Sequence, residues 1–422
     1  MKSINLKVVV ISCFIFTNSL LSFGQDEFLS RSEAIALTLN NNYGIAIADN
    51  NVLVSENNAD LLNSGYLPTV FGLAGMNYPV EDQRTDRDDG ESFVLEGAQS
   101  ESYNASVNLD YTLFDGLGRL YNFKRLKESY NLSKLEARET IENTMLQLFS
   151  VYFEVARLTE NVEILEQTLE ISKNRVKRAG YQFDYGQNTK LEVLNAEVDV
   201  TNDSINLMNT RQSLLNTKRD LNVVLARDLK LNFNVDTLVS FIPKLELDSF
   251  LEMAKENNVR LLQSNSNIAL SEYDIRISKA KFLPTVGLTG SYGWNESISP
   301  ASAFFTGSTR QNTGFQGGLN LRWNLFDGGS SVTQLKNAKI LKDNQILLKQ
   351  QVEIEVQRDI ANALGNYENL IAVYNIQEQN VVTNKNNFER SRERFNLGQI
   401  TSIEFRQAQI NLINAETNKN LA

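Results

Sequence analysis

The 422-residue sequence contains no histidine and only one cysteine, Cys13. The absence of histidine excludes Ser-His and Cys-His catalytic pairs and histidine-ligated metal sites. A single cysteine excludes a disulfide framework. The formal net charge of −10 argues against binding to nucleic acid. Because no pair of acids stands out as a carboxylate active site, we expect a protein that is not an enzyme and holds no metal or other cofactor.

The N-terminal segment 1–24 has the pattern of an export signal. Two lysines precede the apolar run 8–16, and Ser22 and Gly24 are small residues suited to signal cleavage. The run is too short for a spanning helix, which needs about 20 apolar residues, and no later segment is apolar enough for one. The alternatives are a retained anchor and lipidation at Cys13. An exported chain of this kind is periplasmic, secreted or in the outer membrane.

Glycine and proline are absent from two long stretches, residues 119–179 and 187–242. Apolar residues recur there every seven positions, which predicts long coiled-coil helices. The heptad positions are Ile141, Leu148, Val155, Val162, Leu169 and Val176, then Val193, Val200, Leu207, Leu214 and Leu221. We expect long helical hairpins at 117–228 and 329–422.

Glycine gathers instead in residues 65–118 and 287–329, where apolar residues alternate with small or polar ones. This alternation predicts strands at about 67–78, 103–113, 283–294 and 314–325. Strands of about ten residues with one apolar face suit a transmembrane β-barrel, although a soluble sandwich is the alternative. Four strands cannot close a barrel, and unpaired backbone in lipid costs several kcal/mol per group. Several protomers must therefore share one barrel. The polar segments 79–101 and 295–312 are expected to be surface loops.

Three phrases occur twice in the same order. Residues 67–70 and 283–286 both read LPTV, 113–116 and 325–328 both read LFDG, and GQNTKLE at 186–192 matches GQITSIE at 398–404. The offset in numbering is 216 for the first pair and 212 for the other two. A repeat this long is not a short solenoid unit. It predicts two tandem structural repeats, 25–228 and 248–422, joined by a linker at 229–247.

Two details of the repeats concern their ends. In the linker, Leu231, Phe233 and Val235 alternate like a short extra strand. By the offset of 212, Ala422 corresponds to Thr210, which lies in the middle of a predicted helix. This offset predicts either an incomplete chain or a different packing of the last helix.

Each copy has the order helix, strand, loop, strand, long helix, turn and helix, and in this it resembles the TolC-like outer-membrane efflux proteins. The resemblance covers essentially the whole chain after the export signal. It is carried by the duplication, the Leu-Pro-Thr strand entry, the Leu-Phe-Asp-Gly strand exit and asparagine pairs at 41–42 and 257–258. A further mark is the turn phrase of an aromatic residue, a glycine, a threonine and an acid, once in each copy.

The resemblance implies a mostly α fold with a small transmembrane β part. A homotrimer would share a twelve-stranded β-barrel, four strands per chain, above a long α-helical barrel. The location implied is the outer membrane of a Gram-negative bacterium, in contact with lipid, with a periplasmic helical domain. The chain would be the passive exit duct of a tripartite efflux or type I secretion system. Its partners would be a periplasmic adaptor (membrane fusion) protein and an inner-membrane transporter.

Two questions stay open at this point. Drug, metal-ion and protein substrates are not separable, because a duct conducts whatever its transporter delivers. The alternative function from another class is a periplasm-spanning structural or adhesive coiled coil.

The resemblance also places the periplasmic tip at the helical turns 180–190 and 392–402. The candidate tip and adaptor-contact residues are Phe183, Gly186, Thr189, Arg394, Phe395, Gly398 and Thr401. The two glycines suit helix C-caps, and each threonine with the glutamate three residues on, Glu192 or Glu404, suits a capping box.

In the family, acids at the two glutamate positions belong to the pore constriction, so Glu192 and Glu404 are the candidate constriction residues. A ring of acids would favour cations. A basic residue of the family's closing network is replaced by Ile400, and a second acid is replaced by Gln407. The resemblance therefore implies the location of the gate but not its salt bridges.

Overall fold

The computed structural model describes residues 27–241, 253, 256–301 and 306–422. The expected export signal 1–24, the end of the linker and the start of the second copy at 248 lie outside the described residues. The chain divides into two compact units. Unit 1 contains 1–48, 137–257 and 355–422, and unit 2 contains 49–136 and 258–354.

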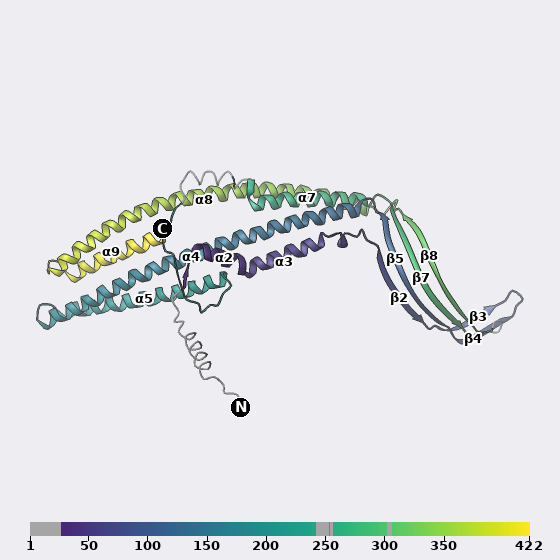
Figure 1. The fold of residues 1–422 in the computed structure, drawn as a ribbon, viewed down its shortest axis with the longest axis horizontal. Coiled ribbons are helices and arrows are strands. Elements are labelled where there is room, and N and C mark those ends of the chain that lie inside the picture. Colours follow the sequence, from purple (N-terminus) through teal and green to yellow (C-terminus); the bar gives the residue numbers. More distant parts are fainter. Residues whose placement is uncertain (1–26, 242–252, 254–255, 302–305) are drawn as a thin grey trace, which may run out of the picture. The chain divides into compact units, whose positions relative to one another are not determined.

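Four antiparallel strands form one sheet in unit 2, in the order β2-β5-β7-β8 (Figure 1). They are β2 (Thr69–Asn77), β5 (Glu101–Phe114), β7 (Thr285–Ser299) and β8 (Ser308–Arg322). β7 and β8 extend further toward their connection than the alternation predicts, and β8 ends three residues earlier than 325. All the added residues except Ile298 are polar, so the hydrophobic pattern gives little sign of them. Backbone pairing, as between Ser299 and Ser308, holds them in the sheet.

Side chains alternate between the two faces of this sheet. Tyr292 lies opposite Phe315 on one face, and the neighbouring pair Ser291 and Gln316 lies on the other. The same alternation holds along much of β5, β7 and β8, so that one face is mainly apolar and aromatic and the other carries asparagine, serine, threonine and glutamine. β2 is less regular, because its Phe71 and Leu73 lie on the polar face, opposite Asn108 and Ser106.

The segment 79–101, expected to be a surface loop, contains a separate two-stranded hairpin. It consists of β3 (Val80–Asp86) and β4 (Ser92–Gln99). The register shifts between Glu81 and Gln83, so a bulge interrupts the period of two. Acidic residues on both strands further hide the pattern, and the expectation of a loop is wrong for this reason.

The Leu-Phe-Asp-Gly phrase connects a strand to a long helix in both copies. Asp115 accepts a hydrogen bond from the backbone N–H of Arg119 at 2.8 Å, and Asp327 accepts one from that of Ser331 at 2.9 Å. The following glycines both have φ of 69°, a backbone angle that favours glycine. The aspartate satisfies an N–H in the first helical turn, and the glycine permits the sharp change of direction.

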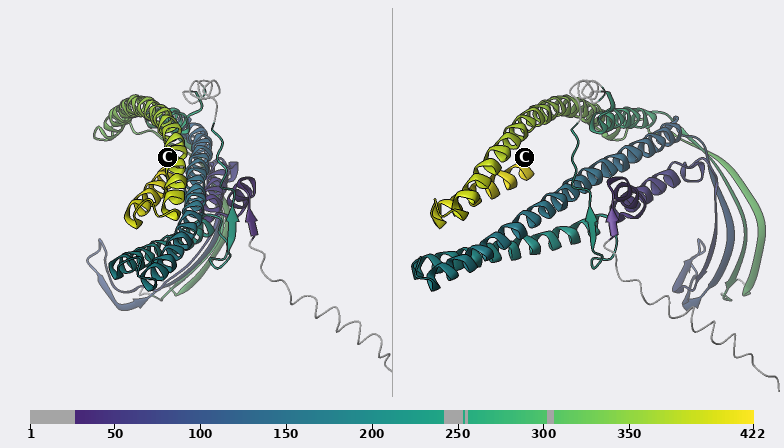
Figure 2. Two further views of the ribbon diagram at one scale, coloured as in Figure 1. Left: turned by 90° about the vertical axis from the view of Figure 1, so that its left-hand side faces the viewer. Right: turned by 60° about the vertical axis from the view of Figure 1, so that its left-hand side comes forward.

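Two long helices follow these junctions, α4 (Gly118–Asp184) and α8 (Ser330–Asn396), each of 67 residues. α5 (Lys190–Val224) returns along α4, and α9 (Ser402–Leu421) returns along α8 (Figure 2). The other helices are α2 (Arg31–Asn41), α3 (Tyr43–Asn58), the short η2 (Leu61–Asn63) and α7 (Val259–Ala280). The predicted fold class, mostly helical with a small strand part, is confirmed. Within the described residues, no helix has the length and hydropathy to cross a membrane.

The main core of unit 1 lies where α4 and α5 meet a two-stranded parallel sheet. This sheet pairs β1 (Glu27–Leu29) with β6 (Phe233–Val235), the latter within the predicted extra strand. Tyr152 of α4 is buried and joins the two strands: its hydroxyl donates to the carbonyl of Leu29 at 2.9 Å and accepts from the N–H of Asp236 at 3.1 Å. Burial raises the pKa of the Tyr152 hydroxyl, which therefore stays protonated.

Candidate functional site

The turn between α4 and α5 begins at a glycine C-cap. Gly186 has φ of 73°, and the N–H of Gln187 donates to the carbonyl of Gln182 at 2.7 Å. This arrangement satisfies carbonyls at the end of α4, which an α-helix leaves without partners. The predicted C-cap role of Gly186 is thus present in the structure.

The start of α5 lacks the capping box that the sequence suggests. Thr189 is the N-cap residue, but its side chain makes no capping hydrogen bond. Its backbone N–H donates to the side-chain oxygen of Asn188 at 2.9 Å. Glu192 is half-buried, and its Oε2 atom has no hydrogen-bond partner. The local capping explanation for Glu192 therefore does not hold.

The turn between α8 and α9 does contain the capping box. Gly398 also has φ of 73°. The N–H of Glu404 donates to the Thr401 hydroxyl at 3.2 Å, and Glu404 Oε2 accepts from the Thr401 N–H at 2.8 Å and its hydroxyl at 2.9 Å. These bonds stabilise the ionised form and lower the pKa of the Glu404 carboxyl.

One sequence difference explains why the two turns are capped differently. In the first copy, Asn188 accepts the backbone N–H of Thr189. In the second copy, the corresponding position is Ile400, which has no acceptor in its side chain. The N–H of Thr401 is therefore left for Glu404. Because of this difference between Asn188 and Ile400, the N–H of Thr189 does not bond Glu192, whereas the N–H of Thr401 holds Glu404 in place.

Aromatic packing fixes the base of the second turn. The rings of Phe395 and Phe405 stack with centroids 4.8 Å apart, and Phe388 stacks on Phe405 at 5.5 Å. The Arg178 guanidinium of α4 lies 4.7 Å from the Phe395 ring and donates to the side-chain oxygen of Asn396 at 2.7 Å. Phe395 therefore belongs to a packed cluster and is less available to another protein than Phe183, which is exposed.

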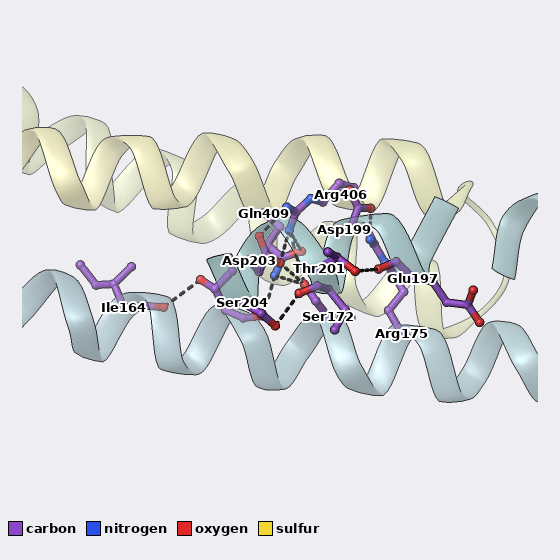
Figure 3. A network of polar contacts seen from close by, with 12 residues as sticks. Ile164, Ser172, Arg175, Glu197, Asp199, Thr201, Asp203, Ser204, Arg406 and Gln409 are labelled. Carbon is purple, nitrogen blue, oxygen red and sulfur yellow. Dashed lines mark hydrogen bonds and ion pairs between the residues drawn. The ribbon is translucent and has the colours of Figure 1, made fainter. Parts of the chain in front are cut away.

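A polar cluster joins α4, α5 and α9 beyond these turns (Figure 3). Both terminal nitrogens of Arg406 in α9 donate hydrogen bonds to the Asp203 carboxylate of α5, at 2.7 and 2.9 Å. Ser172 of α4 donates its hydroxyl to Asp203 at 2.6 Å. Arg175 of α4 pairs with Asp199 of α5, and Arg406 Nε lies 3.5 Å from Asp199. The two acids and two arginines balance in charge.

Because the cluster is buried, its charged groups are stable only when they are paired in one particular geometry. Arg175 and Asp203 are buried, and Nε and Nη1 of Arg175 have no hydrogen-bond partner. Burial lowers the pKa of Arg175, and the neighbouring Asp199 carboxylate opposes that change. Desolvation of such ions offsets much of their attraction. The cluster therefore selects one alignment of the helices rather than adding much stability.

A second heptad pattern, made of polar residues, accompanies the apolar one in α4 and was not used in the sequence analysis. Asn161, Thr168 and Arg175 recur every seven residues on α4, beside the apolar heptad positions. Asn161 bonds Asn420 of α9, and the carbonyl of Thr168 accepts from Gln409 of α9. The contact between the hairpins is thus a polar seam, whereas the first hairpin's own seam includes the apolar Ala179, Val193 and Ala196.

The structure places the sequence-predicted site residues in two turns of unit 1 with different surroundings. Thr189 and Thr401 are both N-cap residues, and Arg394 lies in the last turn of α8. Two exposed aromatic residues beside Phe183, Tyr181 and Tyr185, were not among the candidates. Neither tyrosine belongs to the repeated phrase, which supplied every tip candidate except Arg394.

Comparison with known proteins gives a consistent set of relatives. A family model described as "Outer membrane efflux protein" matches residues 34–227 and 250–422. The outer membrane protein TolC of Vibrio cholerae serotype O1 is 21% identical over 364 residues, covering 85% of this chain and 78% of that protein. The outer membrane efflux protein BepC of Brucella suis biovar 1 is 20% identical over 374 residues, covering 88% and 75%.

A solved structure shares the fold. The CmeC outer membrane channel of Campylobacter jejuni matches with a TM-score of 0.73 and 18% sequence identity, over 92% of this chain and 81% of that chain. The match spans most of both chains.

Proposed function

This chain belongs to the outer membrane efflux protein family, and we propose that it is the exit duct of a tripartite efflux or type I secretion system. It is an outer-membrane protein with a periplasmic helical part. In the proposed role it conducts substrates passively, because the energy comes from an inner-membrane transporter. A periplasmic adaptor protein connects the transporter to the duct.

The observation that carries this proposal is the division of the four-stranded sheet into two unlike faces. The face with Tyr292 and Phe315 suits contact with lipid, and the face with Ser291 and Gln316 suits a water-filled lumen. A soluble sheet packed on a core would also have one apolar face. Here that face stays exposed, as Phe315 and Leu319 illustrate.

The free edges of the sheet support a homotrimer. Among the described residues, β2 and β8 each pair on one side only. An unpaired edge in hydrocarbon leaves backbone groups without partners, at several kcal/mol each. Three chains with four strands each would close one barrel and remove every edge.

We assign the adaptor contact to the exposed surface of the two turns. Tyr181, Phe183 and Tyr185 offer apolar area beside Gly186, and Arg394, Phe395, Gly398 and Thr401 form the second turn. Exposed aromatic side chains are typical anchors of protein interfaces. Glu192 and Glu404 follow the two turns and are proposed as constriction residues, three of each per trimer.

The proposal is tested by membrane fractionation and by conductance. The protein should sediment with outer membranes, require detergent for release, and form discrete cation-preferring channels in planar bilayers. Recovery without detergent, or a pure protein that never conducts, would contradict a duct. Co-purification of a periplasmic adaptor, lost in a Tyr185 variant, tests the tripartite part separately.

A further inference from the structure

Two large apolar side chains lie on the polar face of the four-stranded sheet. On β2, at one edge of the sheet (Figure 1), Phe71 lies opposite Asn108 and Leu73 lies opposite Ser106. The polar-face positions of β5 from Ser102 to Thr112 hold only polar residues, and those of β7 and β8 hold only polar residues and glycine. Phe71 and Leu73 are 39% and 54% exposed, so the described part of the chain does not bury them.

This apolar pair belongs to the first copy alone. By the strand-entry offset of 216, Phe71 corresponds to Gly287 and Leu73 corresponds to Thr289. A Cβ on Gly287 would collide with Oδ1 of Asn320 on β8. The second copy therefore has no room for a side chain at the position of Phe71 while Asn320 keeps its place. Each chain presents the pair once.

Small residues lie beside the pair on the same face. The row of cross-strand neighbours that starts at Leu73 continues through Ser106 and Gly293 to Gly314. A Cβ on Gly314 would meet no atom of the described chain within 4 Å. A flat molecule can therefore lie on this row against Phe71 and Leu73, because only Ser106 adds a side chain there, and that side chain is small.

An acidic residue lies next to the pair on the neighbouring strand. Asp110 of β5 is opposite Thr69, which places it diagonally from Phe71 on the same face. Diagonal neighbours of an antiparallel pair lie about 7–8 Å apart, a distance that one small ligand can span. Asp110 is exposed, and its cross-strand neighbours Thr69 and Thr289 are uncharged. No cation of the sheet therefore lies directly opposite its carboxylate.

We propose that Phe71, Leu73 and Asp110 form a subsite on the lumen wall for an aromatic cation. This inference rests on the proposed function, because the polar face lines a lumen only in a closed barrel, and it adds a class of substrate to the duct. The ring of the ligand contacts Phe71 and Leu73 and removes their apolar surface from water. Its positive group is attracted by the Asp110 carboxylate and by the face of the Phe71 ring.

The combination of groups distinguishes this ligand class from others. A metal ion or a small hydrophilic cation gains nothing from two apolar side chains. An anionic amphiphile would contact the Phe71 ring but would be repelled by Asp110. A neutral aromatic molecule keeps the ring contact and lacks the ionic attraction. An aromatic cation uses all three residues of the subsite.

Cysteine labelling of the full-length protein in outer membranes tests which face these residues occupy. Phe71→Cys should react with a charged, membrane-impermeant thiol reagent, because the polar face is in contact with water. Val70→Cys should react much more slowly, because Val70 lies on the apolar face opposite Leu109. The wild type gives the background, since Cys13 lies in the expected export signal. Equal labelling of the two variants, or faster labelling at Val70, would overturn the subsite.

Block of single channels in planar bilayers measures binding at the subsite. Benzyltrimethylammonium carries a ring and a charge, whereas tetramethylammonium carries the charge alone. Phe71→Ser should weaken block by benzyltrimethylammonium about threefold or more, as expected for an exposed contact between a cation and a ring. It should leave block by tetramethylammonium unaltered. Asp110→Asn should also weaken block by benzyltrimethylammonium, since it removes the charge and keeps the shape.

Two further variants serve as controls for Phe71→Ser. Val70→Ser replaces an apolar residue by serine at the adjacent position on the other face, so both cations should block it as they block the wild type. Phe71→Leu keeps an apolar side chain and removes the ring. It should weaken block by benzyltrimethylammonium with the trimer content unchanged in light scattering.

The outcomes separate this inference from the proposed function. Channels that benzyltrimethylammonium blocks equally in Phe71→Ser, Val70→Ser and the wild type would overturn the subsite and leave the exit duct. Loss of the trimer in Phe71→Ser would mean that a neighbouring copy covers the ring, which would also overturn the subsite. If the wild type forms no channel, the proposed function fails. Ligand-observed NMR of benzyltrimethylammonium with detergent-solubilised wild type and Phe71→Ser then decides whether Phe71 binds it.

Discussion

Arg406 Nη2 lies 2.7 Å from Asp203 Oδ1 and joins α9 to α5, across the boundary between the two helical hairpins. Gln407, next to Arg406, is exposed and donates a hydrogen bond to Asn411 of its own helix. The ionic contact between hairpins therefore lies inside the protomer and is buried.

Removing one partner of this pair should be costly. Arg406→Met leaves the buried Asp203 carboxylate without its cation, which should lower the free energy of unfolding by about 3–5 kcal/mol. Arg406→Met with Asp203→Leu should recover most of that loss, because it leaves no buried charge at this position. Denaturant unfolding of the detergent-solubilised protein measures both. If the single variant matches the wild type, the pair does not align the hairpins.

Glu404 should control ion selectivity if it lines the constriction. Glu404→Ala removes three charges per trimer and should reduce the cation preference of single channels in bilayers. Glu393→Ala makes the same change in charge on an exposed part of α8 and should leave the preference unaltered. Equal selectivity in the two variants would place the constriction elsewhere.

The capping bonds predict how this selectivity depends on pH. Because the folded-state pKa of Glu404 is lowered, the stabilisation by the cap is complete above the ordinary carboxyl pKa of about 4.3. It is lost as the pH falls through the lowered value. Thr401→Val removes the hydroxyl donor but keeps the N–H, so cation preference should disappear at a higher pH than in the wild type.

Reversal potentials at a series of acidic pH values measure this shift. Thr189→Val is the control, because the Thr189 side chain makes no capping hydrogen bond. An identical pH midpoint in Thr401→Val and wild type would mean that the hydroxyl does not act on the selectivity group.

The different caps of the two turns predict that one substitution converts the cap of the first turn into the capping box of the second. Asn188→Ile removes the acceptor that takes the Thr189 N–H, so Glu192 should turn toward Thr189 and form the box seen at Thr401. A crystal structure of the variant would show whether Glu192 accepts this N–H. A Glu192 carboxylate that stays away from Thr189 would refute the competition between Asn188 and Glu192.

The exposed aromatics at the first turn should matter for the adaptor. Tyr185→Ser should weaken co-purification of the adaptor by about tenfold or more, the size of effect expected for an interface anchor. Tyr43→Ser, a similarly exposed tyrosine on α3, serves as control. Unchanged adaptor binding with an intact trimer would exclude Tyr185 from the contact.

Particular elements show what the sequence could and could not predict. The repeated Gly186 and Gly398 predict matching helix ends because only glycine adopts positive φ without strain, and both have φ of 73°. A capping box was predicted for both turns but occurs in one, since the side chain of Asn188, which is Ile400 in the second copy, competes for the same N–H. The Arg406–Asp203 contact joins residues far apart in sequence, and such pairing depends on how the hairpins align.

The equal length of α4 and α8 limits which insertions and deletions the two helices can accept. The same 67 helical residues separate each strand exit from its turn. Deleting one heptad from α4 alone would shorten that helix by about 10 Å and leave α8 unaltered. Asn161 and Thr168 would lose their partners on α9 at once. Insertions and deletions in these helices should therefore be tolerated only in matched pairs, so that the lengths of the two helical hairpins evolve together.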